Sequence, residues 1–249
     1  MNVKNTVSVV LVEDSSLANA NLIFQFVMPS EEVADFSADS NGLDDFKFEI
    51  FSVKEVSEDV IKLSSSQGSF FLRAAYLQNL EEFDIFPNAV LNRQQAEDCM
   101  QAAFAYSAEN VAVTYLARSE QSAFLLKRKL LAKGHEAEYI DRALEYLKGR
   151  GWLSDERYAG AFLRSRSINR SEGRTRLMCE LATRGIDKET ANIALDDFFE
   201  RVDENEILLR AFEKCKRQGK TEEQTQKSLV RLGFSWKDIK KVMSEQLEN

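Results

Sequence analysis

The sequence is poor in the residues from which most catalytic and metal sites are built. It contains one histidine, His135, in 249 residues, which excludes a His-rich metal site and a pair of catalytic histidines. It carries no phosphate-cradling glycine loop and no dinucleotide-binding fingerprint. These absences argue against an enzyme and against a bound cofactor. They leave His135 with a structural role at a junction between helices.

Cysteines and long apolar runs are also scarce. Cys99, Cys179 and Cys215 lie far apart and match neither a disulfide framework nor a metal-ligand spacing. The sequence shows no run of 18 or more apolar residues and no charged-then-apolar leader. We therefore expect a cytoplasmic protein with reduced thiols and no membrane contact.

The net charge of −8 is unevenly distributed along the chain. Residues 1–95 carry 15 acidic and six basic residues, whereas residues 96–249 carry 26 acidic and 27 basic residues. Basic residues are locally in excess in the second part, by nine to four between Lys148 and Arg184 and by ten to four between Arg210 and Lys241. Such stripes attract a phosphate backbone or an acidic protein groove, although a solvated helix surface has the same composition.

Residues 1–95 are predicted to form a small, acidic, β-rich module. Short runs rich in Val, Ile and Phe predict strands at Val7–Val12, Asn21–Met28, Phe46–Val53, Val60–Leu63 and Phe70–Ala74. A turn that contains Gln67-Gly68 joins the last two, and the acidic stretch Glu31–Asp45 is expected to be a loop. This module could tether the rest of the chain or lower its affinity for DNA. Its removal is expected to leave the helices folded.

From about Ala96 the apolar period changes from 2 to 3.6, and one pattern occurs three times. A leucine stands four residues before a glycine at Leu130/Gly134, Leu181/Gly185 and Leu229/Gly233. The glycines are 51 and 48 residues apart, and an apolar pair follows each of them nine and ten residues later. A period of this size indicates modules that stack on their neighbours to bury a shared core.

The pattern predicts a mainly α fold of three tandem three-helix, helix-turn-helix-like repeats in an elongated solenoid. The predicted parts are the β-rich module at 1–95 and the repeats at 96–151, 152–201 and 202–249. The three glycines stand where a helix C-cap requires a left-handed backbone. Ser154 is predicted as an N-cap, and Thr221 with Gln224 as a capping box. Trp152 is expected to pack between repeats.

Two segments of the second repeat carry a resemblance to a known family. Residues 151–166 read Gly-Trp-Leu-Ser-Asp-Glu-Arg-Tyr-Ala-Gly-Ala-Phe-Leu-Arg-Ser-Arg, and residues 173–186 read Gly-Arg-Thr-Arg-Leu-Met-Cys-Glu-Leu-Ala-Thr-Arg-Gly-Ile. Both resemble the motifs of the RecX family of recombination regulators, and residues 115–122 and 129–134 resemble its first repeat. The resemblance is strong over residues 110–200, fair to about 245 and weak before 95. Leu125 departs from the family's Glu and leaves a capping box at Ser122 incomplete.

The resemblance implies a negative regulator that binds in the groove of the RecA–DNA filament. It implies limits on filament growth, strand exchange and co-protease activity in recombinational repair and the SOS response. It also implies no cofactor and no catalysis, and we expect a monomer. The alternative is a nucleic-acid-binding protein that acts through its helix-turn-helix-like repeats. The net charge of only +1 in residues 96–249 argues against this alternative.

Basic side chains of the three repeats are the candidate partner-binding residues, because guanidinium and ammonium groups suit both carboxylates and phosphates. The candidates are Lys127, Arg128, Lys133, Arg164, Arg166, Arg170, Arg174, Arg176, Lys216, Arg217 and Lys220. A competing interpretation applies to Arg176, Glu180 and Arg184, whose spacing of four residues also suits a charge ladder within one helix.

Overall fold

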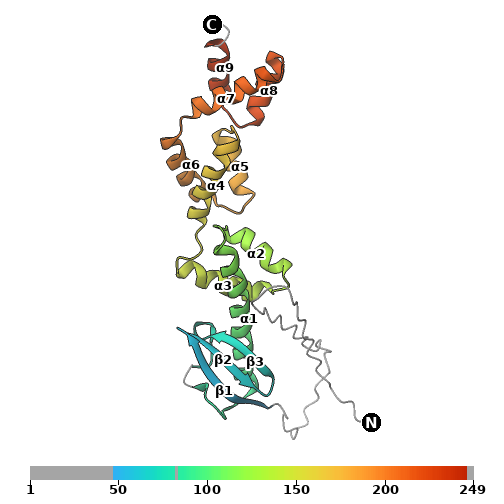
Figure 1. Cartoon of the computed structure of the whole chain (residues 1–249), viewed down its shortest axis with the longest axis vertical. Coiled ribbons are helices and arrows are strands. Elements are labelled where there is room, and N and C mark those ends of the chain that lie inside the picture. The colour runs from blue at the N-terminus through green and yellow to red at the C-terminus, as the bar shows by residue number, and fades with distance from the viewer. Residues whose placement is uncertain (1–46, 82–83, 246–249) are drawn as a thin grey trace, which may run out of the picture. The chain divides into compact units, whose positions relative to one another are not determined.

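The structure, a computed structural model, describes residues 47–81 and 84–245. These residues belong to one compact unit that begins at Phe46. They form a small antiparallel sheet followed by nine α-helices (Figure 1). None of these helices is long and apolar enough to cross a membrane. The predicted strands at Val7–Val12 and Asn21–Met28 and the predicted loop at Glu31–Asp45 lie outside the described residues.

The sheet has the strand order β3-β2-β1-β4. Its strands are β1 (Phe48–Ser57), β2 (Val60–Ser65), β3 (Gly68–Arg73) and β4 (Val90–Leu91). The three strands predicted between residues 46 and 74 are confirmed, as is the turn before Gly68, whose φ is +116°. The sequence did not indicate β4, because two residues are too few to show an alternating pattern. Leu63 pairs with Phe70 across β2 and β3, and both side chains are buried.

Helix α1 (Arg93–Leu116) belongs to both the sheet and the first repeat. It begins with a capping box made by Asn92 and Gln95. Its buried residues are mostly alanines: Ala96 and Ala102 pack in the core beneath the sheet, and Ala112 packs in the core of the first repeat. The core of the β-rich module is therefore continuous with α1. We now expect removal of residues 1–95 to destabilise α1, because it would expose the face of α1 that the sheet covers.

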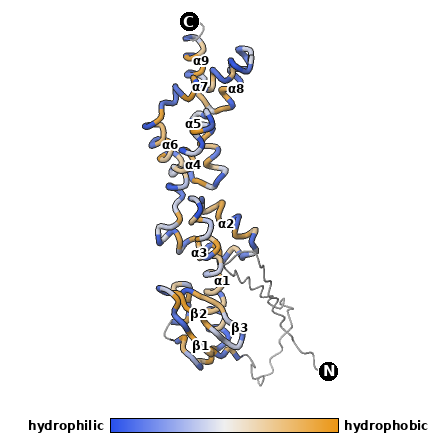
Figure 2. Tube along the Cα trace, in the orientation of Figure 1, coloured by the Kyte–Doolittle hydropathy of each residue, from blue (hydrophilic) through white to orange (hydrophobic). Residues whose placement is uncertain are grey.

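The remaining helices confirm the predicted three-helix repeats. The first repeat combines α1 with α2 (Ala123–Ala132) and α3 (Ala137–Gly149). The second and third consist of α4 (Asp155–Asn169), α5 (Arg174–Ala182), α6 (Lys188–Arg201), α7 (Glu204–Arg217), α8 (Glu222–Arg231) and α9 (Trp236–Glu245). Figure 2 shows hydrophobic residues along β1 to β3 and at intervals along the helices, as amphipathic packing requires. The apolar faces of α3 and α7 are buried.

The recurring leucine and glycine end the middle helix of each repeat in the same way. Gly134, Gly185 and Gly233 have φ values of +88°, +78° and +89°, as predicted. The backbone N–H after each glycine donates a hydrogen bond to the carbonyl of the leucine, with N···O distances of 3.2, 3.2 and 3.4 Å. This is the Schellman motif, which satisfies carbonyls that the helix end would leave without partners. The N-cap at Ser154 and the capping box of Thr221 with Gln224 are also confirmed.

Consecutive repeats meet through one junction that the chain builds twice. The Ser122 hydroxyl, at the N-cap of α2, donates to the carbonyl of Arg184 at the end of α5 (2.7 Å). The backbone N–H of Gly173, at the N-cap of α5, donates to the carbonyl of Leu232 at the end of α8 (2.8 Å). Both N-cap residues stand 12 positions before the glycine of their repeat. The middle helices thus meet end to end, with the positive end of one dipole at the negative end of the next.

A carboxylate from the next repeat completes each junction. Asp155, the first residue of α4, accepts from the backbone N–H of Ala123 (2.8 Å), and Glu204, the first residue of α7, accepts from that of Arg174 (3.0 Å). The capping box at Ser122 is incomplete because Leu125 has no carboxylate. Asp155 instead caps the backbone N–H of the next residue, Ala123.

His135 gives the fold a modest pH dependence. Burial lowers its pKa below the ordinary value, so the unfolded chain binds the proton more tightly than the folded protein does. This contribution to stability is present above pH ~6.5 and is lost as the pH falls below that value. We expect His135→Phe, which copies Phe234 of the third repeat, to reduce the drop in urea midpoint between pH 7.5 and pH 5.5. An unchanged drop in this variant would show that other groups cause it.

Candidate partner-binding surface

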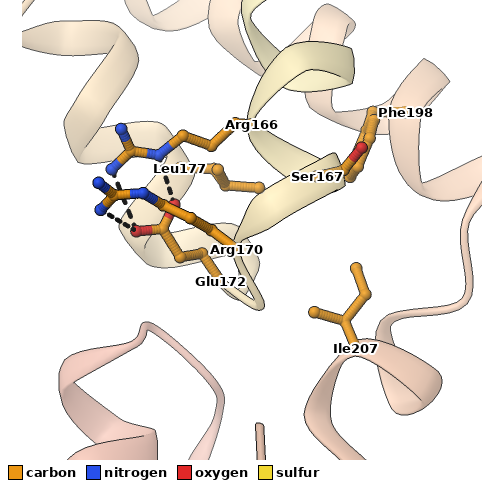
Figure 3. A pocket seen from close by; sticks show the side chains of 7 residues that line it. All are labelled: Arg166, Ser167, Arg170, Glu172, Leu177, Phe198 and Ile207. Atoms are coloured by element: carbon orange, nitrogen blue, oxygen red, sulfur yellow. Dashed lines mark hydrogen bonds and ion pairs between the residues drawn. The ribbon is translucent and has the colours of Figure 1, made fainter. Parts of the chain in front are cut away.

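Most of the predicted basic residues of the second repeat form ion pairs with carboxylates of the same repeat. Arg166 at the end of α4 donates through Nε and Nη2 to the two carboxylate oxygens of Glu172 (2.6 and 3.1 Å). Figure 3 shows Arg170 converging on the same carboxylate, at an N···O distance of 3.9 Å. The side chain of Glu172 is only 5% exposed. A bidentate, nearly buried pair of this kind holds its arginine firmly in place.

Glu180 on α5 pairs with three arginines, one of which, Arg166, also pairs with Glu172. Arg176 and Arg184 lie 2.7 and 2.8 Å from its carboxylate, and Arg166 lies 3.4 Å from it. The intrahelical ladder is therefore confirmed. Burial alone would raise the pKa of Glu180, but the hydrogen bond from Arg184 and the three positive charges outweigh burial and lower the pKa. The hydrogen bond to Glu172 raises the pKa of Arg166, so this guanidinium stays charged.

Arg174 and Arg164 differ sharply in their surroundings. The Arg174 guanidinium lies 2.6 Å from the carboxylate of Asp196 on α6 and donates to the amide oxygen of Asn192 (3.5 Å). Arg164 is exposed and has no carboxylate partner among the described residues. Of the five arginines predicted for a basic face here, four thus serve internal ion pairs.

The cluster around Glu172 does not form a ligand site. Its cavity, bordered by the side chains labelled in Figure 3, has a volume of about 10 Å³. That volume holds about one water molecule. The described residues also contain no group of three or more His, Cys, Asp or Glu side chains placed to hold a metal ion. What this region offers to a partner is its surface.

The candidates of the first repeat divide in the same way. Lys127 pairs with Asp141 of α3 at 2.6 Å. The guanidinium of Arg128 lies over the ring of Phe124, 5.8 Å from its centroid. Lys133 is exposed at the C-terminal end of α2. A cation is favourable there because this end of the helix dipole is negative.

In the third repeat the candidates gather where α7 ends. Lys216 lies over the ring of Phe212 at 4.9 Å, and Arg217 is exposed next to it. Lys220 points its ammonium group at the Ser228 hydroxyl (3.0 Å). The structure therefore leaves five exposed candidates with no carboxylate partner in the described part of the chain. These are Arg128, Lys133, Arg164, Lys216 and Arg217.

Sequence reasoning missed two features of this surface. Trp152 is 47% exposed, with its ring 6.0 Å from the Arg150 guanidinium, so it is not buried between repeats as predicted. Phe124 is the second feature. In the sequence it is one apolar residue among several in α2, and nothing there indicates its contact with the second repeat. Its Cβ lies 2.2 Å from the point that a Cβ on Gly185 would occupy. The glycine is thus required by contact with the preceding repeat as well as by its backbone angle.

Comparison with known proteins identifies two of the three repeats. A family model described as "RecX, first three-helix domain" matches residues 108–147, and "RecX, second three-helix domain" matches residues 154–195. The chain is 39% identical over 143 residues to "Regulatory protein RecX" of Treponema pallidum (strain Nichols), which covers 57% of this chain and 87% of that protein. It is 31% identical over 142 residues to "Regulatory protein RecX" of Chromohalobacter salexigens, over 55% of this chain and 91% of that protein.

A solved structure shares the fold. "Crystal structure of regulatory protein RecX" aligns with 79% of this chain and 99% of its own, with a TM-score of 0.64 and 18% sequence identity. At this identity the match concerns the fold alone.

Proposed function

The chain belongs to the RecX family, and from this membership we propose that it regulates the RecA recombinase by binding the RecA–DNA filament. The observation that carries the proposal is the match of successive repeats to the two RecX domains, in order, along one chain. Bound in the filament groove, the repeats would act sterically. They would limit filament growth, strand exchange and co-protease activity in the cytoplasm without any catalytic step.

The junctions between repeats support a steric role. Each junction is fixed by a hydrogen bond between helix ends and by a carboxylate from the next repeat. A series of modules fixed in this way presents its surface residues at set positions to a partner, and pre-organisation of this kind reduces the entropic cost of binding.

The five exposed cations without carboxylate partners are the contacts we propose for the filament. They can approach carboxylates of the protein or phosphates of its DNA without first breaking an internal ion pair. Arg166, Arg174 and Arg176 are poorer choices, because reversal of their charge would disrupt the pairs that hold α4, α5 and α6.

RecA ATPase activity on single-stranded DNA, titrated with this protein, tests the proposal. We expect inhibition by the native chain. In a variant with Arg128→Glu, Arg164→Glu and Lys216→Glu, we expect the half-inhibitory concentration to rise by about tenfold or more, which corresponds to about 1.4 kcal/mol. The matched control carries Lys188→Glu, Lys237→Glu and Lys241→Glu, the same charge change at exposed lysines outside the candidate set. It should inhibit as the native chain does.

The outcomes separate the partner from the site. Equal inhibition by native, test and control chains would keep RecA as the partner and place the contact elsewhere. No inhibition by the native chain would contradict the proposal. A steep salt dependence of binding to DNA alone would then favour the nucleic-acid-binding alternative.

A further inference from the structure

A groove is lined by residues of α2 and α3 of the first repeat, two helices that contact each other. Its volume is about 320 Å³, at the lower end of the range of protein ligand sites. Its lining combines apolar and charged side chains: Ala123, Phe124, Lys127, Asp141, Leu144, Glu145 and Lys148.

In the second repeat an arginine of the chain itself bridges the equivalent two helices. Arg174, the first residue of α5, forms a 2.6 Å ion pair with Asp196 of α6. Counted from the glycine of each repeat, Arg174 corresponds to Ala123 and Asp196 corresponds to Glu145. The first repeat has therefore kept the carboxylate on its third helix, but it has a methyl group where the second repeat has the guanidinium.

The carboxylate of Glu145 is the group in this groove that lacks a cation. Asp141 is held by Lys127 at 2.6 Å, and Lys148 lies 3.9 Å from Asp155. Glu145 is exposed and has no ion pair within the described residues. Beside it, the ring of Phe124 is 46% exposed.

We propose that this groove binds an arginine side chain of a partner protein. A guanidinium would form an ion pair with Glu145, as Arg174 does with Asp196, beside the exposed side chain of Phe124. Phosphate is a poorer occupant, because the two lysines of the lining, Lys127 and Lys148, already pair with carboxylates, whereas Glu145 has no cation. The partner is thus a protein surface that presents an arginine beside apolar residues. The inference does not depend on which protein supplies the arginine, so it goes beyond the regulation of RecA.

The test uses the whole chain and a minimal probe, N-acetyl-arginine methylamide, in an NMR titration. The citrulline analogue has nearly the same shape but no charge. We expect the arginine probe to shift the amide signals of Phe124, Leu144 and Glu145, and the citrulline probe to bind about two- to fivefold more weakly, the ratio typical of an exposed ion pair. Ala123→Arg should abolish these shifts, because it gives the first repeat the internal arginine that the second repeat has.

Two further variants complete the test. Glu145→Gln removes the carboxylate with little change in shape and should bind both probes equally weakly. Ala132→Arg adds the same charge at the exposed end of α2 and should retain native binding. Equal binding of arginine and citrulline by the native chain would overturn the proposal. The proposal would also be overturned if Ala123→Arg or Glu145→Gln bound the arginine probe as the native chain does. None of these results depends on an effect on RecA.

Discussion

Replacement of Glu109 by glutamine is expected to lower the free energy of unfolding by about 3–5 kcal/mol, the usual cost of leaving one member of a buried ion pair alone. Glu109 lies on α1 and accepts two hydrogen bonds from Arg73 of β3, at 2.8 and 2.6 Å. The Tyr76 hydroxyl donates to the same carboxylate at 2.9 Å. The side chains of Arg73 and Glu109 are only 9% and 2% exposed.

The surroundings of Arg73 keep its charge in place. Its guanidinium lies 4.6 Å from the ring centroid of Tyr146 and 5.5 Å from that of Tyr106. Burial would lower the pKa of Arg73, but the hydrogen bond and charge of Glu109 outweigh burial and raise the pKa. In Glu109→Gln the guanidinium remains charged, because arginine is not deprotonated in proteins, and it loses its counter-ion. Since this pair joins the sheet to α1, the loss falls on the contact between the β-rich module and the first repeat.

A double-mutant cycle separates this mechanism from simple loss of packing. Arg73→Met alone should destabilise by a similar amount, while Arg73→Met with Glu109→Gln should cost much less than the sum, because both charges are then gone. Asp141→Asn, which removes the partner of the exposed Lys127, is the control and should cost less than about 1 kcal/mol. Urea unfolding followed by circular dichroism gives the four values. A cost for Glu109→Gln no larger than that of the control would contradict the mechanism.

The features that could be predicted from the sequence are those encoded within a few neighbouring residues. The Schellman motif needs only a glycine and a buried leucine four positions before it, so Leu130 and Gly134 are enough to predict the helix end. The capping box at Thr221 spans four residues and was predicted for the same reason. Alternation in Phe46–Val53 likewise located β1.

The fate of the charges could not be predicted in this way, because it depends on residues that the fold brings together. Arg73 and Glu109 are 36 positions apart, and Glu172 stands in a connection with no periodic pattern. Asp98 on α1 accepts hydrogen bonds from the backbone N–H groups of Asn79 and Leu80, at 2.8 and 3.0 Å. A count of basic residues therefore overestimated the free positive charge of the second repeat. The ladder at Glu180, set by spacing alone, was the exception.

Replacement of Gly233 by alanine is expected to destabilise the third repeat by at least about 2 kcal/mol more than replacement of Gly134 by alanine, because only Gly233 is overpacked by a Cβ. The two glycines have φ values of +89° and +88° and occupy the same position in the Schellman motif. The cost of a left-handed alanine, about 1–2 kcal/mol, is therefore common to both variants.

The difference between the two glycines lies in what a Cβ would meet. At Gly134 it would meet no atom within 4 Å other than those of the adjoining residues in the described chain. At Gly233 it would lie 2.3 Å from the backbone nitrogen of Arg176 and 2.6 Å from its Cβ. Neither atom can move without shifting α5. The substitution would therefore push the end of α8 away from α5 and weaken the hydrogen bond that Leu232 accepts from Gly173.

Hydrogen exchange resolves where the cost falls, since repeat proteins can unfold in parts. In Gly233→Ala the amides of α8 and α9 should lose protection while those of α2 and α3 keep theirs. In Gly134→Ala any loss should be confined to the end of α2. Similar exchange in both variants would mean that the end-to-end contact of α5 and α8 contributes little to stability. The junction would then be a consequence of repeat stacking, and the hydrophobic cores would determine the order of the repeats by themselves.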